Sequence, residues 1–329
     1  MKRIIITLFV LLSMFSSFSE GVREDYAQKK VYKIGISKLL AHPALDAIEE
    51  GIKDYLDSTG YAFEYDVQNA NGEVTAASQI AQVFKDEGTD LNIGIATPTA
   101  QALANVCVDT PLIYSSVTDP TAAGLVGKGM ENIAGVSDMV PVAAHLSLIM
   151  QIVPELESLG MVYTSGEANG IVLMEAMKAA AEDEGVDLIT ASVANSSEVR
   201  MAAESIIDRV DAVYVATDNT VISAITALSD VCMAHRIPLF SADTTSSYGT
   251  DVLLAGGFDY YASGLLTGEI VERYLDGENL EDIGVVYLDQ ESLEIYLNMD
   301  VASALGLTIP ETIADSAAIV VSGGRAEEV

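Results

Sequence analysis

The chain has 329 residues, of which 50% are hydrophobic, so it is long enough to form about two domains with separate cores. Its 49 acidic and 16 basic residues give a formal net charge of −33. A chain this acidic is repelled by nucleic acid and by anionic membranes, so neither is expected as a partner.

The start of the chain has the pattern of an export signal. A basic start, Met1-Lys2-Arg3, is followed by the apolar run 4–18 and by the small residue Ser19. The run has about 15 residues, whereas a membrane-spanning helix needs about 20, so a retained anchor is the weaker interpretation. We therefore predict a signal peptide at residues 1–19 and a soluble protein in the periplasm or another extracytoplasmic space. No cysteine lies near the cleavage site, so the usual lipid anchor is not expected.

Beyond this leader, apolar and β-branched segments alternate with helical segments rich in Ala, Glu and Lys. Strands separated by helices of about ten or more residues predict parallel, doubly wound sheets. In the first half we expect strands at 31–37, 63–68, 91–96, 111–115 and 133–136. In the second half we expect them at 159–163, 187–193, 212–216, 237–241 and 252–256, with helices beginning near Asn169, Ser196, Asp218, Thr244 and Tyr261.

The second half repeats the pattern of the first. Residues 93–100 and 213–220 each run from an apolar strand through Ala-Thr into the start of a helix. The repeat predicts an α/β fold of two Rossmann-like lobes, with a hinge near 137–142, where Pro141 interrupts the pattern. We assign residues 31–139 and about 260–287 to the first lobe, and residues 140–259 and about 288–329 to the second.

Nearly every predicted strand ends in Ser, Thr, Asp or Asn. Ligands of open α/β sheets bind beyond the carboxyl ends of the strands, so these residues converge on one region if the lobes face each other. The same residue types are also the preferred N-caps of helices, which gives each of them an alternative, purely structural role.

Two groups of these residues are also candidates for binding the charged groups of a ligand. Pro98 at a first helical position leaves the N–H groups of Thr97 and Thr99 for a carboxylate, which the helix dipole also favours. Three carboxylates that follow different strands could together receive an ammonium group. These carboxylates are Asp119, Asp218 and Asp243. Such a site suits an amino acid, while a neutral polar solute such as a sugar or a nucleobase stays open as the alternative.

Neither a catalytic site nor a metal site is indicated. His42, His145 and His235 are dispersed, and none pairs with Ser, Cys or Asp at the spacing of a triad or a metal centre. We interpret His42, at a helix start, as a capping residue. Cys107 and Cys232 are expected to be buried free thiols. We expect no enzyme activity, no metal and no cofactor.

Aromatic residues fall into two groups. Those on strands are expected in the core, because a parallel strand is covered on both faces; they are Tyr114, Tyr163, Tyr214 and Phe240. Those near the predicted cleft loops are candidates for packing against a ligand side chain; they are Tyr248, Phe258, Tyr260 and Tyr261.

Taken together, six segments resemble, in order, the ABC-transporter substrate-binding proteins that include the tryptophan and tyrosine uptake type. The resemblance extends over the whole mature chain. The segments are residues 41–47 (AHPALDA), 96–101 (ATPTAQ), 116–120 (SVTDP), 135–138 (GVSD), 166–169 (GEAN) and 217–220 (TDNT). The sequence departs from the family pattern at Ala41, where the resemblance implies an acidic residue, and at Gly170, where it implies serine.

The resemblance implies the type I periplasmic-binding-protein fold, in which two lobes close on a solute and present it to a membrane permease. The cleft residues that it implies are Ser37, Thr97, Thr99, Thr118, Asp119, Asn169, Thr217, Asp218, Asn219 and Asp243. We therefore expect a monomeric receptor for an aromatic or apolar amino acid that serves an ABC importer. A receptor for a sugar or nucleobase, and a sensory ligand-binding module, are the alternatives.

Overall fold

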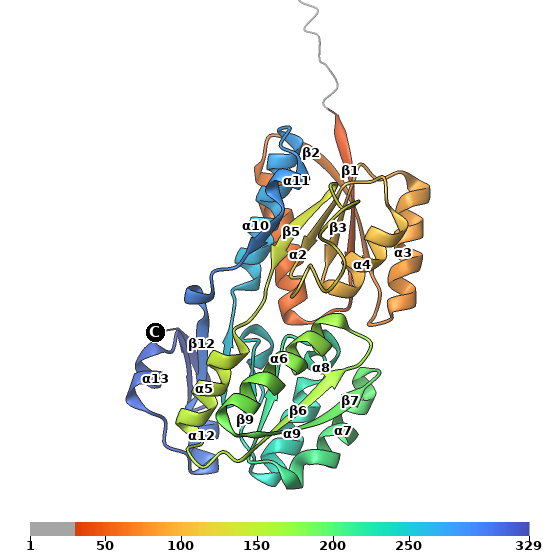
Figure 1. Ribbon diagram of the computed structural model, residues 1–329. Coiled ribbons are helices and arrows are strands. Elements are labelled where there is room, and N and C mark those ends of the chain that lie inside the picture. Colours follow the sequence, from red (N-terminus) through yellow and green to blue (C-terminus); the bar gives the residue numbers. More distant parts are fainter. Residues whose placement is uncertain (1–29, 329) are drawn as a thin grey trace, which may run out of the picture.

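The computed structural model describes residues 30–328, and the predicted signal peptide lies outside them. The chain forms two α/β lobes, one above the other in Figure 1. Every strand predicted in the two halves is present, with ends that differ by a few residues. The prediction of two Rossmann-like lobes is therefore confirmed. Within residues 30–328, no helix combines the length and the apolar character that crossing a membrane requires.

The first lobe is built on a parallel sheet in the order β11-β5-β4-β3-β1-β2. Its core is formed by the apolar inner faces of the strands and of the helices that cover them. The elements are β1 (Val31–Lys38), α2 (Pro43–Ser58), β2 (Ala62–Asn69), α3 (Val74–Glu87), β3 (Leu91–Ile95), α4 (Thr97–Val106), β4 (Leu112–Ser115), β5 (Ile133–Ser137), α10 (Tyr260–Leu275), α11 (Leu280–Ile283) and β11 (Val285–Tyr287).

The second lobe is built on a sheet in the order β14-β13-β12-β10-β9-β8-β6-β7. Its elements are α5 (Val142–Ile152), β6 (Ser158–Thr164), α6 (Ala168–Glu184), β7 (Asp187–Val193), α7 (Val199–Ile206), β8 (Ala212–Val215), α8 (Asn219–Ile222), α9 (Ile225–His235), β9 (Leu239–Ser241), β10 (Leu254–Gly257), β12 (Glu294–Asn298), α12 (Met299–Leu305), α13 (Glu311–Ser316), β13 (Ile319–Ser322) and β14 (Arg325–Glu328).

The second lobe differs from the sequence-based expectations in two ways, one in its sheet and one in a helix. The sheet is not wholly parallel, because β12 runs antiparallel to β10 and β14 antiparallel to β13. The chain leaves the lobe after β10, passes through α10 and β11 of the first lobe, and returns from the opposite direction (Figure 1). In addition, the helix expected near Thr244 is only the short 3₁₀ turn Thr245–Ser247.

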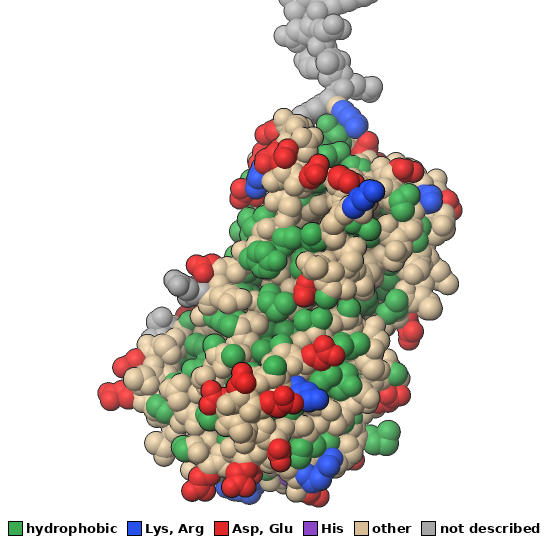
Figure 2. All heavy atoms as spheres, viewed as in Figure 1, with side chains coloured by type: hydrophobic (Ala, Val, Ile, Leu, Met, Phe, Trp, Pro, Cys, Tyr) green, Lys and Arg blue, Asp and Glu red, His purple; other side chains and the backbone are tan. Residues whose placement is uncertain are grey.

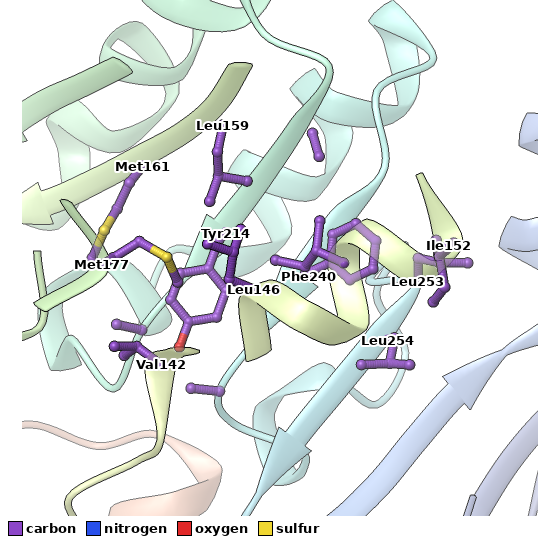
Figure 3. Packing of buried hydrophobic residues seen from close by; sticks show 14 of the residues in the cluster. Val142, Leu146, Ile152, Leu159, Met161, Met177, Tyr214, Phe240, Leu253 and Leu254 are labelled. Atoms are coloured by element: carbon purple, nitrogen blue, oxygen red, sulfur yellow. The ribbon is translucent and has the colours of Figure 1, made fainter. Parts of the chain in front are cut away.

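The chain crosses between the lobes after β5, after β10 and after β11. The first crossing contains the predicted hinge and leads into α5. Figure 3 shows Val142 and Leu146 of α5 beside Tyr214 and Phe240, which lie on β8 and β9. Both aromatic rings are fully buried, as expected for parallel strands. This packing fixes the crossing segment to the second lobe.

The two cysteines are buried and unbridged in different lobes, as predicted. Figure 2 shows acidic side chains scattered over both lobes rather than gathered in one patch. A scattered arrangement is typical of a solvated surface.

Helices α2 and α10 pack unusually closely, and glycine makes this possible. A Cβ atom at Gly264 would lie 2.3 Å from the carbonyl oxygen of Ile48 and 3.0 Å from the Cα atom of Gly51. We expect Gly264→Ala to lower the free energy of unfolding by about 1 to 3 kcal/mol, because the two backbones must separate. Urea denaturation measures the loss. Gly60→Ala is the control, since nothing lies within 4 Å of its added Cβ atom, and equal losses in both variants would contradict the explanation.

Candidate ligand-binding site

A cavity lies where the carboxyl ends of strands from both lobes face each other. Its empty volume, counted together with space open to solvent, is about 330 Å³. No lysine or arginine of residues 30–328 lines it. The lining residues are His42, Ala44, Leu45, Ser116, Thr118, Asp138, Asn169, Thr217, Asn219, Ile222, Asp243 and Tyr260.

Two buried carboxylates face this cavity from different lobes. Asp138 follows β5, and its Oδ1 accepts a hydrogen bond from the Thr118 hydroxyl at 3.2 Å. Burial, with a smaller contribution from the charge of Asp243, raises the pKa of Asp138 to about 6. Asp243 follows β9 and accepts hydrogen bonds from the backbone N–H and hydroxyl of Ser246, at 3.0 and 2.7 Å. Two buried acids on a cavity that no described lysine or arginine lines provide acceptors suited to a cation.

Two residues of the first lobe add polar groups and aromatic surface. His42 precedes α2, and its side chain makes no capping hydrogen bond, so the expected capping role is wrong; its ring lies beside the amide of Asn219. Burial lowers the pKa of His42 despite the opposing charge of Asp243, so at neutral pH the ring offers one donor and one acceptor. Tyr260, one of the predicted cleft aromatics, is 4% exposed. Burial and the nearby Asp138 and Asp243 raise the pKa of its hydroxyl, which stays protonated.

The second lobe contributes two amides and a hydroxyl. The Nδ2 group of Asn169 donates to the backbone carbonyl of Thr217 at 2.9 Å and to Glu167 at 3.2 Å. The Nδ2 group of Asn219 donates to the same carboxylate at 2.6 Å. The Oδ1 atom of Asn169 and the hydroxyl of Thr217 are buried without a partner in the described chain. Buried polar atoms are nearly always paired, so these atoms indicate a site for a polar ligand.

The structure places half of the sequence-predicted site residues on the cavity and half away from it. On the cavity are Thr118, Asn169, Thr217, Asn219 and Asp243. Away from its lining are Ser37, Thr97, Thr99, Asp119 and Asp218. Residues that the sequence reasoning did not select as polar ligand-binding groups are His42, Ser116 and Asp138.

Three of the residues outside the lining, Thr99, Asp119 and Asp218, are used within the fold, whereas the hydroxyls of Ser37 and Thr97 are buried without a partner in the described chain. The hydroxyl of Thr99 donates to the carbonyl oxygens of Ile95 and Ala96. Asp119 accepts from the backbone N–H groups of Thr121 and Ala122, both at 2.9 Å. The predicted triad of acids is therefore not assembled, and only Asp243 of the three reaches the cavity.

Asp218 is the third acid of that predicted triad. It accepts from the N–H and hydroxyl of Thr164 at 2.6 and 2.7 Å, and it caps α8 through Val221. Burial and the charge of Glu167 raise its pKa to about 7. These contacts tie β6 to the start of α8, so Asp218 supports the wall of the cavity from behind.

Comparison with known proteins agrees with this geometry. The chain is 33% identical over 287 residues to a tyrosine-binding protein of Clostridioides difficile, covering 85% of this chain and 82% of that protein. A solved structure of an ABC domain in complex with L-Trp from Streptococcus pneumoniae is 30% identical, with a TM-score of 0.83. That match covers 89% of this chain and 100% of the other.

A third similar protein was solved without a ligand. The ligand-free, open structure of a substrate-binding protein with adhesive properties from Clostridium difficile is 32% identical, and the match covers 88% of this chain and 99% of that one. Its TM-score is only 0.64. At nearly equal identity, the TM-score is thus higher for the L-Trp complex than for the ligand-free, open structure, and in Figure 2 the two lobes of this chain meet without an open gap on the face shown.

The family model described as ABC transporter substrate binding protein matches residues 33–321, which is almost the whole described chain. The two lobes have the type I periplasmic-binding-protein fold. The chain therefore belongs to the ABC transporter substrate-binding protein family.

Proposed function

We propose that this protein is the extracytoplasmic receptor of an ABC importer and binds an aromatic amino acid in the cavity between its lobes. The observation that carries the proposal is the pair of buried acids, Asp138 and Asp243, in a cavity that no described lysine or arginine lines. Such a pair matches an ammonium group, which a sugar or nucleobase lacks. The names of the relatives agree, since one binds tyrosine and another was solved with L-Trp.

The remaining lining residues can accommodate the other parts of such a ligand. Leu45, Ile222 and the ring of Tyr260 provide an apolar surface for an aromatic side chain. The hydroxyl groups of Ser116 and Thr217, and the N–H of neutral His42, are available as donors to a carboxylate. The cavity thus offers a complement to each part of an aromatic amino acid.

Binding and release follow from the two-lobe architecture. A ligand that contacts both lobes favours the closed arrangement in proportion to its preference for that state. We propose that the closed, monomeric receptor docks on the membrane permease, and that the solute is released chemically unchanged. Among the described residues that line the cavity, no serine or threonine hydroxyl is hydrogen-bonded to the imidazole of His42.

Direct titration tests the proposal. The chain contains no tryptophan, so the fluorescence of added L-Trp can be excited selectively and followed without a protein background. We expect saturable binding of L-Trp or L-Tyr, with a change in L-Trp emission as the indole enters the closed cavity. Calorimetry with a panel of amino acids, sugars and nucleobases completes the measurement. Binding of a sugar or nucleobase, with no binding of any amino acid, would replace the proposed ligand.

A further inference from the structure

Glu167 is a buried carboxylate directly behind the cavity. It is 3% exposed, lies immediately before α6, and does not line the cavity itself. Its Oε1 atom accepts from the backbone N–H and the hydroxyl of Thr220 at 3.0 and 2.6 Å. Its Oε2 atom accepts from the Nδ2 groups of Asn219 and Asn169 at 2.6 and 3.2 Å. Glu167 therefore joins the starts of α6 and α8 and holds both cavity amides.

These contacts fix which way each amide is turned. A carboxylate can only accept hydrogen bonds, so each asparagine must present its NH₂ group to Glu167. For Asn169 the second partner, the carbonyl oxygen of Thr217, is also only an acceptor. The amide oxygen is then the polar atom left to face the cavity, and the Oδ1 atom of Asn169 is indeed buried without a partner in the described chain.

We propose that Glu167 is a positioning residue for ammonium recognition, which it performs by holding Asn169 and Asn219 with their oxygens toward the ligand. This inference rests on the proposed function and goes beyond it. The unpartnered Oδ1 atom of Asn169 and the carboxylates of Asp138 and Asp243, which line the same cavity, would together form the acceptor surface for the ammonium group. An ammonium group supplies only donors and is complementary to that surface, whereas the same position disfavours another acceptor.

Glu167→Gln should reverse this arrangement while changing the side-chain shape very little. The backbone N–H of Thr220 can only donate, so the glutamine oxygen must turn toward it. The glutamine NH₂ group then faces Asn219, whose amide must turn its oxygen toward it, whereas Asn169 stays held by the carbonyl of Thr217 and loses only its bond to residue 167. The NH₂ group of Asn219 would then become a donor on the cavity and oppose an ammonium group.

The test compares L-Trp with indole-3-propionate, which has the same ring and carboxylate but no ammonium group. The preference ratio is the Kd of indole-3-propionate divided by the Kd of L-Trp. We expect this ratio to be high in the native protein and to fall by about tenfold or more in Glu167→Gln. A general loss of fold or of closure would weaken both ligands alike and leave the ratio unchanged. The ratio therefore separates a positioning role from a merely structural one.

Asp211→Asn is the matched control. Asp211 accepts three hydrogen bonds, from the N–H of Glu157 and from the N–H and hydroxyl of Ser158, and it lies before β8, at the end of the strand away from the cavity. This variant should leave the ratio as in the native protein. If Glu167→Gln does not fold, Asn169→Ala serves instead, because removing the amide oxygen should also lower the ratio.

The outcomes separate the two proposals. Native protein that binds L-Trp or L-Tyr, with an unchanged ratio in folded Glu167→Gln, overturns the role of Glu167 and leaves the proposed function standing. An unchanged ratio in folded Asn169→Ala likewise overturns the role of Glu167 and leaves the proposed function standing. Native protein that binds no aromatic amino acid overturns the proposed function, and the role of Glu167 with it.

Discussion

Asp243→Asn is expected to weaken the binding of an aromatic amino acid by about 100-fold, which corresponds to about 3 kcal/mol. Asp243 is 2% exposed, so its attraction for an ammonium group is little screened by water. The asparagine oxygen can still accept from the N–H of Ser246, which preserves the loop after β9. Calorimetry with L-Trp or L-Tyr at neutral pH measures the loss.

The comparison with Asp119→Asn makes this test specific. The sequence predicted equal roles for Asp119 and Asp243, but Asp119 is used by Thr121 and Ala122 and does not line the cavity. Its variant should therefore bind with native affinity. Equal losses in the two variants would favour the site predicted from sequence over the cavity in the structure. Native affinity in Asp243→Asn would remove this acid from the ammonium receptor.

The fold could be predicted because its signal is repeated along the chain. Each apolar strand and each following helix obeys the same periodicity, and a parallel strand needs little beyond its own sequence to be recognised. The tail after residue 288 carried no such repeat. The direction of β12 depends on where the chain re-enters the second lobe, which no local pattern records.

The site could be predicted only in part, for a different reason. Asp138, Asp218 and Asp243 have the same local setting after a strand, but Asp218 is turned inward because Thr164 and Val221 supply donors to it. Whether a carboxylate caps a helix or faces a ligand depends on partners more than 50 positions away in the sequence. His42 was missed because its position before a helix suggested capping, although its ring makes no such bond.

Gly170, where the sequence departs from the family pattern, is explained by close packing. A Cβ atom there would lie 2.5 Å from the Oδ2 atom of Asp218 and 3.1 Å from the carbonyl oxygen of Thr164. In this chain the start of α6 approaches β6 too closely for a serine side chain. The departure therefore belongs to the packing behind the cavity, since Gly170 does not line it.

Asp138→Asn is expected to stabilise the unliganded protein while weakening ligand binding. Burial raises the pKa of Asp138 from its ordinary 3.8 to about 6, so keeping it ionised at pH 7 costs about 3 kcal/mol of folding free energy. Asparagine removes this cost and keeps the oxygen that accepts from Thr118. The same change removes a negative charge from the ammonium receptor, so the affinity for L-Trp or L-Tyr should fall by about tenfold or more.

The pH dependence distinguishes this cause from improved packing. A carboxyl group with a raised pKa binds more protons in the folded than in the unfolded state between pH 3.8 and about 6. Its destabilising contribution is therefore complete above pH 6 and disappears below pH 3.8.

Urea denaturation measures this difference. The midpoint of Asp138→Asn should lie above that of the native protein at pH 7, and the two midpoints should be equal near pH 3.8. Equal stabilisation at both pH values, or destabilisation at pH 7, would show that Asp138 is not held ionised against burial. The opposite changes in stability and affinity would then identify Asp138 as a group whose charge is kept in the cavity for the ligand.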